Sequence, residues 1–250
     1  MFIDTHCHLS IDDYDDIDLV IKENKSAGVD KIIISGCSKD GILESLSLAE
    51  KYEDVYVTIG YHPSEVNYVN DELLDELRLQ LSYDKVVGLG EIGLDYYYGK
   101  ETRDEQLILF EKQLKIAEEL GIVVVVHSRD ATQDTIDCLK KYNVKGVIHC
   151  FSGSVETANI YVGMGYKIGI GGVGTFKNSK LYEVVKSVGL NNIVLETDSP
   201  YLTPVPFRGQ KNSSKHIPII AECVSKILDV SVEEVASVTT DNACYLFDLD

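Results

Sequence analysis

The sequence predicts a single (β/α)8 barrel with an extra C-terminal helix, and three observations carry this prediction. Eight apolar, β-branched runs recur at intervals of roughly 20 to 35 residues along the chain. Segments with helical periodicity lie between most of these runs. Polar side chains that are costly to bury stand at the ends of the runs. Strands that alternate with helices pair in parallel through right-handed crossovers, and eight such units close into a barrel.

The apolar runs are the predicted strands, and each is short enough for one strand of a parallel sheet. They cover residues 1–5, 31–36, 55–60, 86–91, 122–127, 147–151, 166–171 and 193–198. In a barrel the carboxyl ends of all strands meet at one rim. We therefore expect the functional residues at the ends of these runs.

The clearest predicted helix covers residues 102–120. Thr102 and Glu105 match a capping box at its start, and Gly121 stands where a helix end favours glycine. Its apolar stripe consists of Leu107, Phe110, Leu114, Ala117 and Leu120. Further helices are predicted over 19–27, 42–51, 72–81, 131–141 and 179–188.

The last predicted helix covers residues 231–247 and is the extra one. Ser231 and Glu234 match a second capping box at its start. No Pro-, Gly- or Ser-rich linker, low-complexity tract or close internal repeat interrupts the sequence. We therefore expect one domain over residues 1–250.

The composition limits the partners of the protein. The formal net charge is −18, which argues against broad wrapping of duplex DNA, because non-specific affinity comes from basic residues that neutralise phosphates. A local cationic site is compatible with this charge.

The chain carries no sign of export or membrane insertion. Its longest wholly apolar stretch, residues 122–126, is far shorter than the roughly 20 residues of a membrane helix. No basic region precedes an apolar signal segment at the start. The six cysteines form no CxxC pair, which is typical of reduced thiols. We expect a cytoplasmic protein with no disulfide, no membrane association and no obligate protein partner.

Six polar residues mark the ends of five predicted strands. They are His6, His8, Glu91, His127, His149 and Asp198. Side chains two apart on a strand share a face, so His6 and His8 point the same way and Cys7 points to the other side. In an open sheet these strand ends would spread over more than about 15 Å, whereas a closed barrel brings them to one mouth.

Each of these histidines, taken alone, is also compatible with a packed or hydrogen-bonded core residue. The set favours metal binding, because four of the chain's six histidines occupy equivalent strand ends. Asp198 lies in an otherwise apolar strand, where an unpaired buried charge is costly. Four imidazoles and two carboxylates suit two divalent ions, with one carboxylate able to bridge them.

Six motifs along the whole chain are specific in combination. They are the segments 2–9 (FIDTHCHL), 60–63 (GYHP), 90–96 (GEIGLDY), 126–131 (VHSRDA), 149–153 (HCFSG) and 196–202 (ETDSPYL). With these motifs the chain resembles the TatD-related deoxyribonucleases, a branch of the metal-dependent, amidohydrolase-like barrel superfamily. The resemblance implies a TIM-like barrel, two divalent ions, and hydrolysis of DNA as single strands or from 3′ ends.

The resemblance also assigns the ligands. It implies one ion on His6, His8 and Asp198, and a second ion on His127 and His149. Glu91 then bridges them, where many relatives in the wider superfamily use a carboxylated lysine, and this favours the nuclease branch over cyclic-amide hydrolases. Asp198 is also the expected general base, because a carboxylate beside the attacking water can take its proton. Histidine and carboxylate ligands leave Mg²⁺, Mn²⁺ and Zn²⁺ as alternatives.

The loop after the eighth strand departs from the family pattern. Family members usually continue there with Arg-Gly-Lys-Arg/Lys-Asn-Glu-Pro, whereas residues 208–215 of this chain read RGQKNSSK. The absent Glu-Pro pair leaves the substrate preference open and leaves the predicted ligands unchanged.

Four residues are predicted to bind the substrate. They are His62, Arg129, Arg208 and Tyr96. His62 follows the third strand and is assigned to a phosphate oxygen or the leaving group; the alternative is a histidine that caps the turn before Pro63. Arg129 is assigned to a phosphate, because a guanidinium can bind two oxygens, and a structural salt bridge is the alternative.

Arg208, Lys211 and Lys215 make residues 208–215 the most basic short segment, which either holds a nucleic-acid backbone or is a solvated loop. Tyr96 opens a run of three tyrosines, residues 96–98, that either stacks unpaired bases or packs against the next helix. Glu196 shares a strand face with Asp198 and is expected to orient a ligand.

The predicted function is a two-metal phosphodiesterase, specifically a deoxyribonuclease with 3′-to-5′ exonuclease character. Two alternatives stay open. The same ions can activate water to attack an amide, ester or lactone, because the metal ligands alone do not determine which group is attacked. The acidity of the chain favours this alternative. A metal-binding module without turnover is the other, and the complete set of ligands and base argues against it.

Overall fold

The computed structural model describes residues 1–249, which divide into two compact units. Unit 1 contains Met1–Ile34 and the residues from His149 onward, and unit 2 contains Ser35–Ile148. The expectation of one domain over residues 1–250 stays a prediction beside this division.

Eight strands form one sheet in the sequential order β1-β2-β3-β4-β5-β6-β7-β8. Their bounds are β1 Phe2–Cys7, β2 Val29–Gly36, β3 Val55–Ile59, β4 Val86–Asp95, β5 Val124–Arg129, β6 Gly146–Ile148, β7 Lys167–Ile170 and β8 Ile193–Leu195. In unit 1, β1 pairs with β2 and β7 with β8, both in parallel. In unit 2, β3, β4, β5 and β6 pair in parallel, each with the next.

The last strand lies beside the first within unit 1. The hydroxyl of Thr5 on β1 donates to the carbonyl of Leu195 on β8 at 3.0 Å. Just beyond β8, the backbone N–H of Asp198 donates to the carbonyl of His6 at 3.0 Å. A sheet with sequential strand order whose last strand returns to its first is that of a (β/α)8 barrel. The predicted fold class is confirmed.

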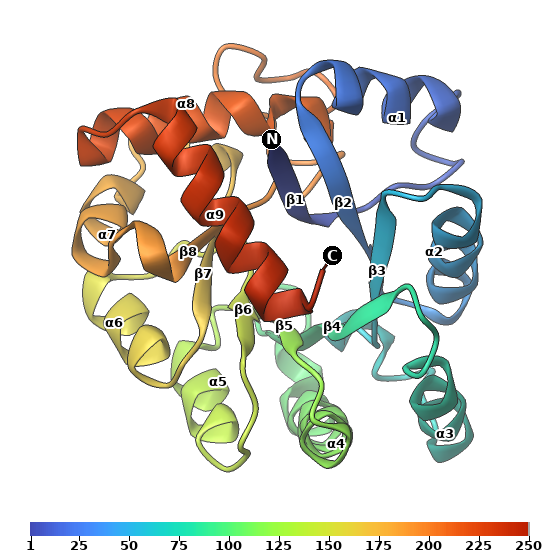
Figure 1. The fold of residues 1–250 in the computed structure, drawn as a ribbon. Helices are drawn as coiled ribbons and strands as arrows, with labels where there is room; N and C mark the ends of the chain where they lie inside the picture. The colour runs from blue at the N-terminus through green and yellow to red at the C-terminus, as the bar shows by residue number, and fades with distance from the viewer. Residues whose placement is uncertain (250) are drawn as a thin grey trace. The chain divides into compact units, whose positions relative to one another are not determined.

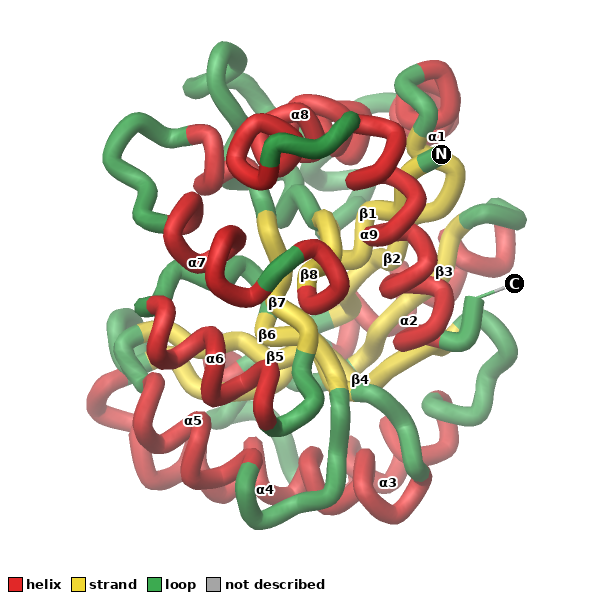
Figure 2. The backbone as a smooth tube through the Cα atoms, turned by 60° about the vertical axis from the view of Figure 1, so that its left-hand side comes forward, coloured by secondary structure: helices red, strands yellow, loops and turns green. Residues whose placement is uncertain are grey.

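Helices connect the strands. They are α1 Ile17–Ser26, α2 Lys39–Lys51, α3 Asp71–Gln80, α4 Arg103–Leu120, α5 Thr132–Leu139, α6 Val155–Gly163, α7 Leu181–Val188, α8 Ile217–Leu228 and α9 Val232–Phe247. In unit 2, α2, α4 and α5 pack against β3, β4 and β5 (Figure 2). In unit 1, α9 packs against β1 and β8 and is the predicted extra helix (Figure 1).

The strands are apolar because helices cover them and side chains on both faces are buried. All residues of β1, Phe2–Cys7, are buried. Within β5, Val124, Val125 and Val126 are at most 1% exposed. The six cysteines are free thiols, as predicted. Among the described residues, no helix combines the length and apolar character that crossing a membrane requires.

At three of the predicted polar residues, the observed strand does not end where the sequence predicts. β6 ends at Ile148 and β8 at Leu195, so His149 and Asp198 follow their strands. β4 instead runs past Glu91 to Asp95. Its pairing with β5 shifts register between Gly90 and Ile92 and then continues to its last residue. Glu91 therefore lies inside a strand, and the prediction that it ends one is wrong.

The predicted capping box at the start of α4 does not form. The Thr102 hydroxyl donates to the carbonyl of Gly99 at 3.1 Å and accepts from Gln106 Nε2 at 3.1 Å, and it makes no cap hydrogen bond. The carbonyl of Gly99 and the side chain of Gln106 therefore take the place of a helix N–H group as partners of this hydroxyl. At the other end Gly121 has a left-handed φ of 67°, as its type predicts.

Candidate functional site

The end of β1 presents two histidines on one face. His6 is buried and His8 is 25% exposed, and their Nε2 atoms lie 3.3 Å apart. Cys7 points to the other side, where its thiol donates to the carbonyl of Ile33 at 3.6 Å. The alternation predicted from the sequence is confirmed.

Asp198 joins this pair within unit 1. Its Oδ1 lies 3.6 Å from His6 Nε2 and 3.5 Å from His8 Nε2. The backbone fixes this arrangement, because the N–H of His8 donates to the carbonyl of Ser199 at 2.7 Å. Asp198 itself has a left-handed φ of 53°, a conformation that is costly for a residue with a side chain and is concentrated at functional sites.

Asp4 holds the ends of β1 and β8 together and was not singled out from the sequence. It is fully buried, and its carboxylate accepts from the N–H of Thr197 at 3.0 Å and from the Thr197 hydroxyl at 2.5 Å. Burial raises the pKa of Asp4 to about 6, although these hydrogen bonds oppose the shift. The available signal was an aspartate in a buried strand, on the same face as His6 and His8.

His149 lies in the same group. Its ring stacks on that of His6 with centroids 4.1 Å apart, and ligand atoms of His6, His149 and Asp198 all lie within 4.8 Å of one another. Glu196 is buried next to it, with Oε1 3.9 Å from His149 Nδ1. The same oxygen accepts from the N–H of Cys150. This placement fits the predicted role of Glu196 in orienting a ligand.

Glu196 is an unusual carboxyl group, because burial raises its pKa to about 8. A glycine makes room for it: a Cβ on Gly169 would lie 2.5 Å from Glu196 Oε2. The glycine-rich end of β7 is therefore packed against this carboxyl.

The unit 1 group fits a divalent ion. Ligands about 2.1 Å from a tetrahedral ion lie about 3.4 Å from one another. The three separations among His6 Nε2, His8 Nε2 and Asp198 Oδ1 are 3.3, 3.6 and 3.5 Å. Two imidazoles and a carboxylate at these distances are a donor set that Zn²⁺ and Mn²⁺ accept.

A second group lies in unit 2 and centres on Glu91, which is buried in β4. Its Oε1 lies 2.7 Å from His127 Nδ1 and 3.8 Å from His62 Nε2. The thiol of Cys37 donates to its Oε2 at 3.6 Å. The structure thus brings together three predicted site residues: Glu91, His127 and His62.

Asp95 contacts the other side of His127. Its Oδ2 lies 3.1 Å from His127 Nε2, so the imidazole stands between two carboxylates. Burial lowers the pKa of His127, but the hydrogen bonds to Asp95 and Glu91 outweigh it and raise the pKa to about 9. A carboxylate behind a ligating histidine fixes its ring and increases its basicity. Asp95 is therefore a candidate site residue to which the motif of residues 90–96 alone assigns no role.

His62 caps the turn that follows it, which is the alternative interpretation from the sequence. The N–H of Ser64 donates to His62 Nδ1 at 3.1 Å, which caps the short turn Pro63–Glu65. Because Nδ1 accepts a hydrogen bond, the proton of the neutral ring lies on Nε2. That nitrogen faces Glu91 and is a hydrogen-bond donor.

Tyr96 and Arg129, the predicted substrate residues at the ends of β4 and β5, both contact other side chains of unit 2. The Tyr96 hydroxyl donates to Asp134 Oδ2 at 2.6 Å. Arg129 is exposed, and its guanidinium carbon lies 4.1 Å from the ring centroid of Tyr97 and 4.8 Å from that of Tyr98. The exposed tyrosines of the run are thus the two that follow Tyr96.

The three basic residues of the loop after β8 have different partners. Lys215 Nζ lies 2.7 Å from Glu23 Oε2 on α1, and Lys211 donates to a backbone carbonyl between β1 and α1. Arg208 is exposed and lies over the ring of Phe176, 3.9 Å from its centroid. Arg208 and Lys211 are both exposed, and the two lysines tie the loop to α1 and to the segment that precedes it.

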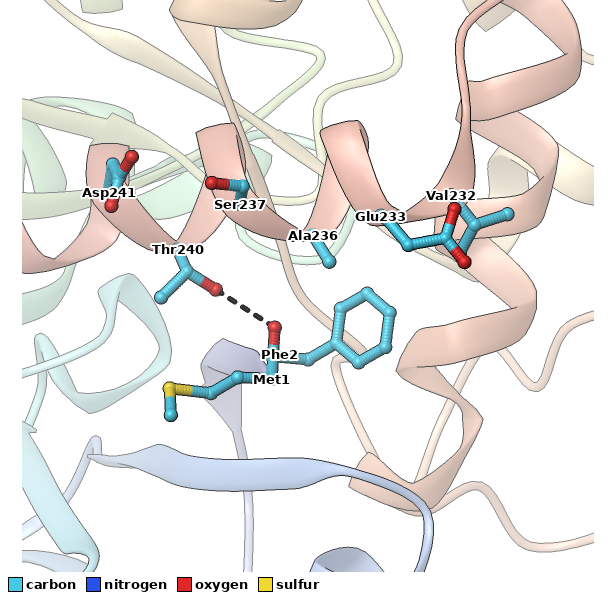
Figure 3. Close-up of a pocket in the computed structure, with 8 residues that line it drawn as sticks. All are labelled: Met1, Phe2, Val232, Glu233, Ala236, Ser237, Thr240 and Asp241. Atoms are coloured by element: carbon cyan, nitrogen blue, oxygen red, sulfur yellow. Dashed lines mark hydrogen bonds between the residues drawn. The ribbon is translucent and has the colours of Figure 1, made fainter.

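A groove of about 520 Å³ lies at the opposite end of β1 from His6. It is lined by Met1, Phe2 and one face of α9, and Thr240 Oγ1 donates to the carbonyl of Met1 at 3.3 Å (Figure 3). Active sites of barrels form at the carboxyl ends of the strands, so this groove is not the candidate site.

The comparisons with known proteins agree with the fold and with metal dependence. The model of the TatD-related DNase family matches residues 3–248. The chain is 37% identical to the uncharacterized metal-dependent hydrolase YabD of Bacillus subtilis, over 99% of both chains. It is 37% identical to the uncharacterized metal-dependent hydrolase YcfH of Escherichia coli, over 99% of this chain and 96% of the relative.

Among solved structures, the TatD homologue YjjV of Escherichia coli is similar over 100% of this chain and 98% of its own, with a TM-score of 0.93 and 32% identity. A family match across nearly the whole chain and relatives at this identity establish the family. The chain therefore belongs to the TatD-related DNase family of metal-dependent hydrolases.

Proposed function

We propose that the chain is a divalent-metal-dependent deoxyribonuclease that removes nucleotides from single strands or 3′ ends. One observation carries the proposal: His6 Nε2, His8 Nε2 and Asp198 Oδ1 lie 3.3 to 3.6 Å from one another, the spacing of ligands around one divalent ion. In unit 2, Glu91 and His127 meet at 2.7 Å. The family match supports a nucleic-acid substrate.

The proposed ligands keep the sequence prediction for the first ion and change it for the second, to which Glu91 is assigned; the bridging role of Glu91 stays an expectation from the family resemblance. His6, His8 and Asp198 hold one ion in unit 1, and Glu91 and His127 hold a second in unit 2. The stacking of His149 on His6 also supports a role for His149 in the first group. Its assignment to the second ion remains a prediction from the family resemblance. Residues 1–250 are proposed to act as one hydrolase domain.

The divalent ions, when bound, lower the pKa of water and polarise the phosphoryl group. Asp198 accepts the proton of the attacking water, which its 16% exposure allows. His62 donates from Nε2 to a phosphate oxygen or to the departing sugar oxygen. Asp95 keeps His127 oriented. Arg129 and Arg208 supply positive charge for the phosphates of the substrate in an otherwise acidic chain.

The test is digestion of a single-stranded oligonucleotide with a free 3′ end, after chelation and then with Mg²⁺, Mn²⁺ or Zn²⁺. We expect nucleotide release only with metal, and a loss of at least about 100-fold in Asp198→Asn, as for removal of a general base. Asp71→Asn, at a carboxylate that is 84% exposed, is the control and should retain activity. Unchanged release after chelation, or in His127→Ala, would contradict the proposal.

Hydrolysis of an uncharged amide, ester or lactone is the second candidate, and the net charge of −18 favours it. A generic ester substrate separates the two candidates. Inhibition of ester hydrolysis by short oligonucleotides supports the nuclease, and absence of inhibition supports the second candidate. Absence of any metal-dependent turnover would instead leave a binding module.

A further inference from the structure

Two exposed aromatic rings stand side by side in the turn after β4. Tyr97 is 59% exposed and Tyr98 is 74% exposed. Their ring centroids lie 4.7 Å apart at 88°, so the edge of one ring faces the other. This turn directly follows the strand that carries Glu91, and it presents flat apolar surface to solvent.

Arg129, the last residue of β5, contacts both rings. Its guanidinium carbon lies 4.1 and 4.8 Å from their centroids. β4 and β5 keep it there, because Asp95 pairs with Arg129 in the sheet and the N–H of Tyr96 donates to its carbonyl at 2.9 Å. We name Tyr97, Tyr98 and Arg129 the tyrosine platform.

Buried groups hold the backbone of the turn that carries the two tyrosines. Asp95 Oδ1 accepts from the N–H of Tyr97 and from that of Tyr98, both at 2.9 Å. Gln106 is buried in α4, and its side chain donates to the carbonyls of Asp95 and Gly99 at 3.0 and 2.8 Å. A fixed turn loses little conformational entropy when a ligand stacks on it.

The same carboxylate connects the platform to the candidate metal group. While Oδ1 of Asp95 holds the turn, Oδ2 lies 3.1 Å from His127 Nε2. The residue that orients His127 therefore also fixes the backbone of the turn that carries the rings.

We propose that the tyrosine platform binds an unpaired nucleobase on its rings and an adjacent phosphate on Arg129. This inference rests on the proposed nuclease function and names which residues select single-stranded substrate. Base–aromatic stacking tolerates any base, because every base has a π face, and it requires a base that is not paired. Arg129 adds a cation beside the rings, in a chain whose net charge of −18 otherwise repels a phosphate backbone.

Binding without hydrolysis tests the proposal independently of catalysis. A series of labelled single-stranded oligonucleotides is prepared, each with one abasic site at a different position. Chelated protein is added to each at low salt, and binding is measured by fluorescence anisotropy. For the wild type, loss of the base at one position should weaken binding about tenfold. In Tyr97→Leu/Tyr98→Leu that penalty should disappear, and in Tyr97→Phe/Tyr98→Phe it should persist.

Two further variants complete the design. Tyr83→Leu removes a tyrosine with a similar exposure of 55% at the other end of β4, and should keep the penalty. Arg129→Gln should reduce the slope of log affinity against log salt by about 0.7, the value for one phosphate contact on a single strand. An abasic penalty equal in wild type and Tyr97→Leu/Tyr98→Leu would overturn the proposal.

The outcome also separates the platform from the proposed function. A base-dependent penalty that needs both tyrosines, found in a protein that releases no nucleotide with any metal, supports the platform and rejects the nuclease. Metal-dependent nucleotide release with no base-dependent penalty supports the nuclease and rejects the platform.

Discussion

At the scale of single residues, the chemistry depends on carboxylates that act through histidines. His127 stands between Glu91 and Asp95, at 2.7 and 3.1 Å. The sequence predicted Glu91 and His127, because their residue types at strand ends suggest metal ligands. The role of Asp95 could not be predicted, because it depends on the extension of β4 beyond Glu91. Asp4 was missed for a similar reason, since its partner Thr197 lies 193 residues away.

Replacement of Asp95 should weaken the metal group of unit 2 without unfolding the protein. In Asp95→Asn the His127 ring loses its charged partner, so we expect divalent-metal affinity and nucleotide release to fall by about 10- to 100-fold. Calorimetric metal titration measures the affinity. Asp134→Asn, at the carboxylate bonded to Tyr96 and Arg103, is the matched control and should leave metal affinity unchanged. Equal affinity in Asp95→Asn and wild type would contradict the role of Asp95.

At the scale of elements, strands were easier to predict than helices. The buried parallel strands are continuous apolar runs, and the sequence located all eight. Two helices were not predicted. α6 buries only Ala158 and Tyr161, so it has no apolar stripe. α8 buries Ile217, Ile220, Ala221 and Val224 at helical spacing, but it has a proline in its first turn, where proline starts a helix but is easily taken for a helix breaker in a sequence.

The two predicted capping boxes differ in outcome, and this gives an element-scale prediction. Ser231 accepts from the N–H of Glu234 at 3.0 Å, so it caps α9 as predicted. Ser231→Ala should lower the free energy of unfolding by about 1 kcal/mol. Ser237→Ala, at an exposed position inside α9, is the control and should cause no loss. Denaturant unfolding measures both, and equal stability of Ser231→Ala and wild type would show that the cap is unimportant.

At the scale of the whole molecule, the regular alternation of strand and helix was sufficient to predict the barrel. The substrate contacts were less predictable, because they depend on which partner each side chain finds in the folded chain. The sequence leaves Lys215 as a nucleic-acid contact or a solvated residue, and in the structure it pairs with Glu23. The sequence does not distinguish three adjacent tyrosines, and in the structure the Tyr96 hydroxyl bonds to Asp134 while Tyr97 and Tyr98 are exposed.

Metal binding should stabilise the folded chain as a whole, because the ligands come together only on folding. An ion at 100 times its dissociation constant adds about 2.7 kcal/mol, which raises the melting temperature of a chain of this size by roughly 5 to 10 °C. Calorimetry of chelated protein with and without Mn²⁺ measures the shift. In His6→Ala/His8→Ala we expect a smaller shift, and a shift as large as in wild type would exclude these histidines as ligands.

Two-metal hydrolysis is tested most directly by a titration of chelated protein with Mn²⁺, with the initial rate of nucleotide release from a 3′-ended single strand measured at each addition. We predict no release without metal and a rate that reaches its maximum at two ions per chain. Release by the metal-free protein, or no release at any ratio of metal to chain, would contradict it.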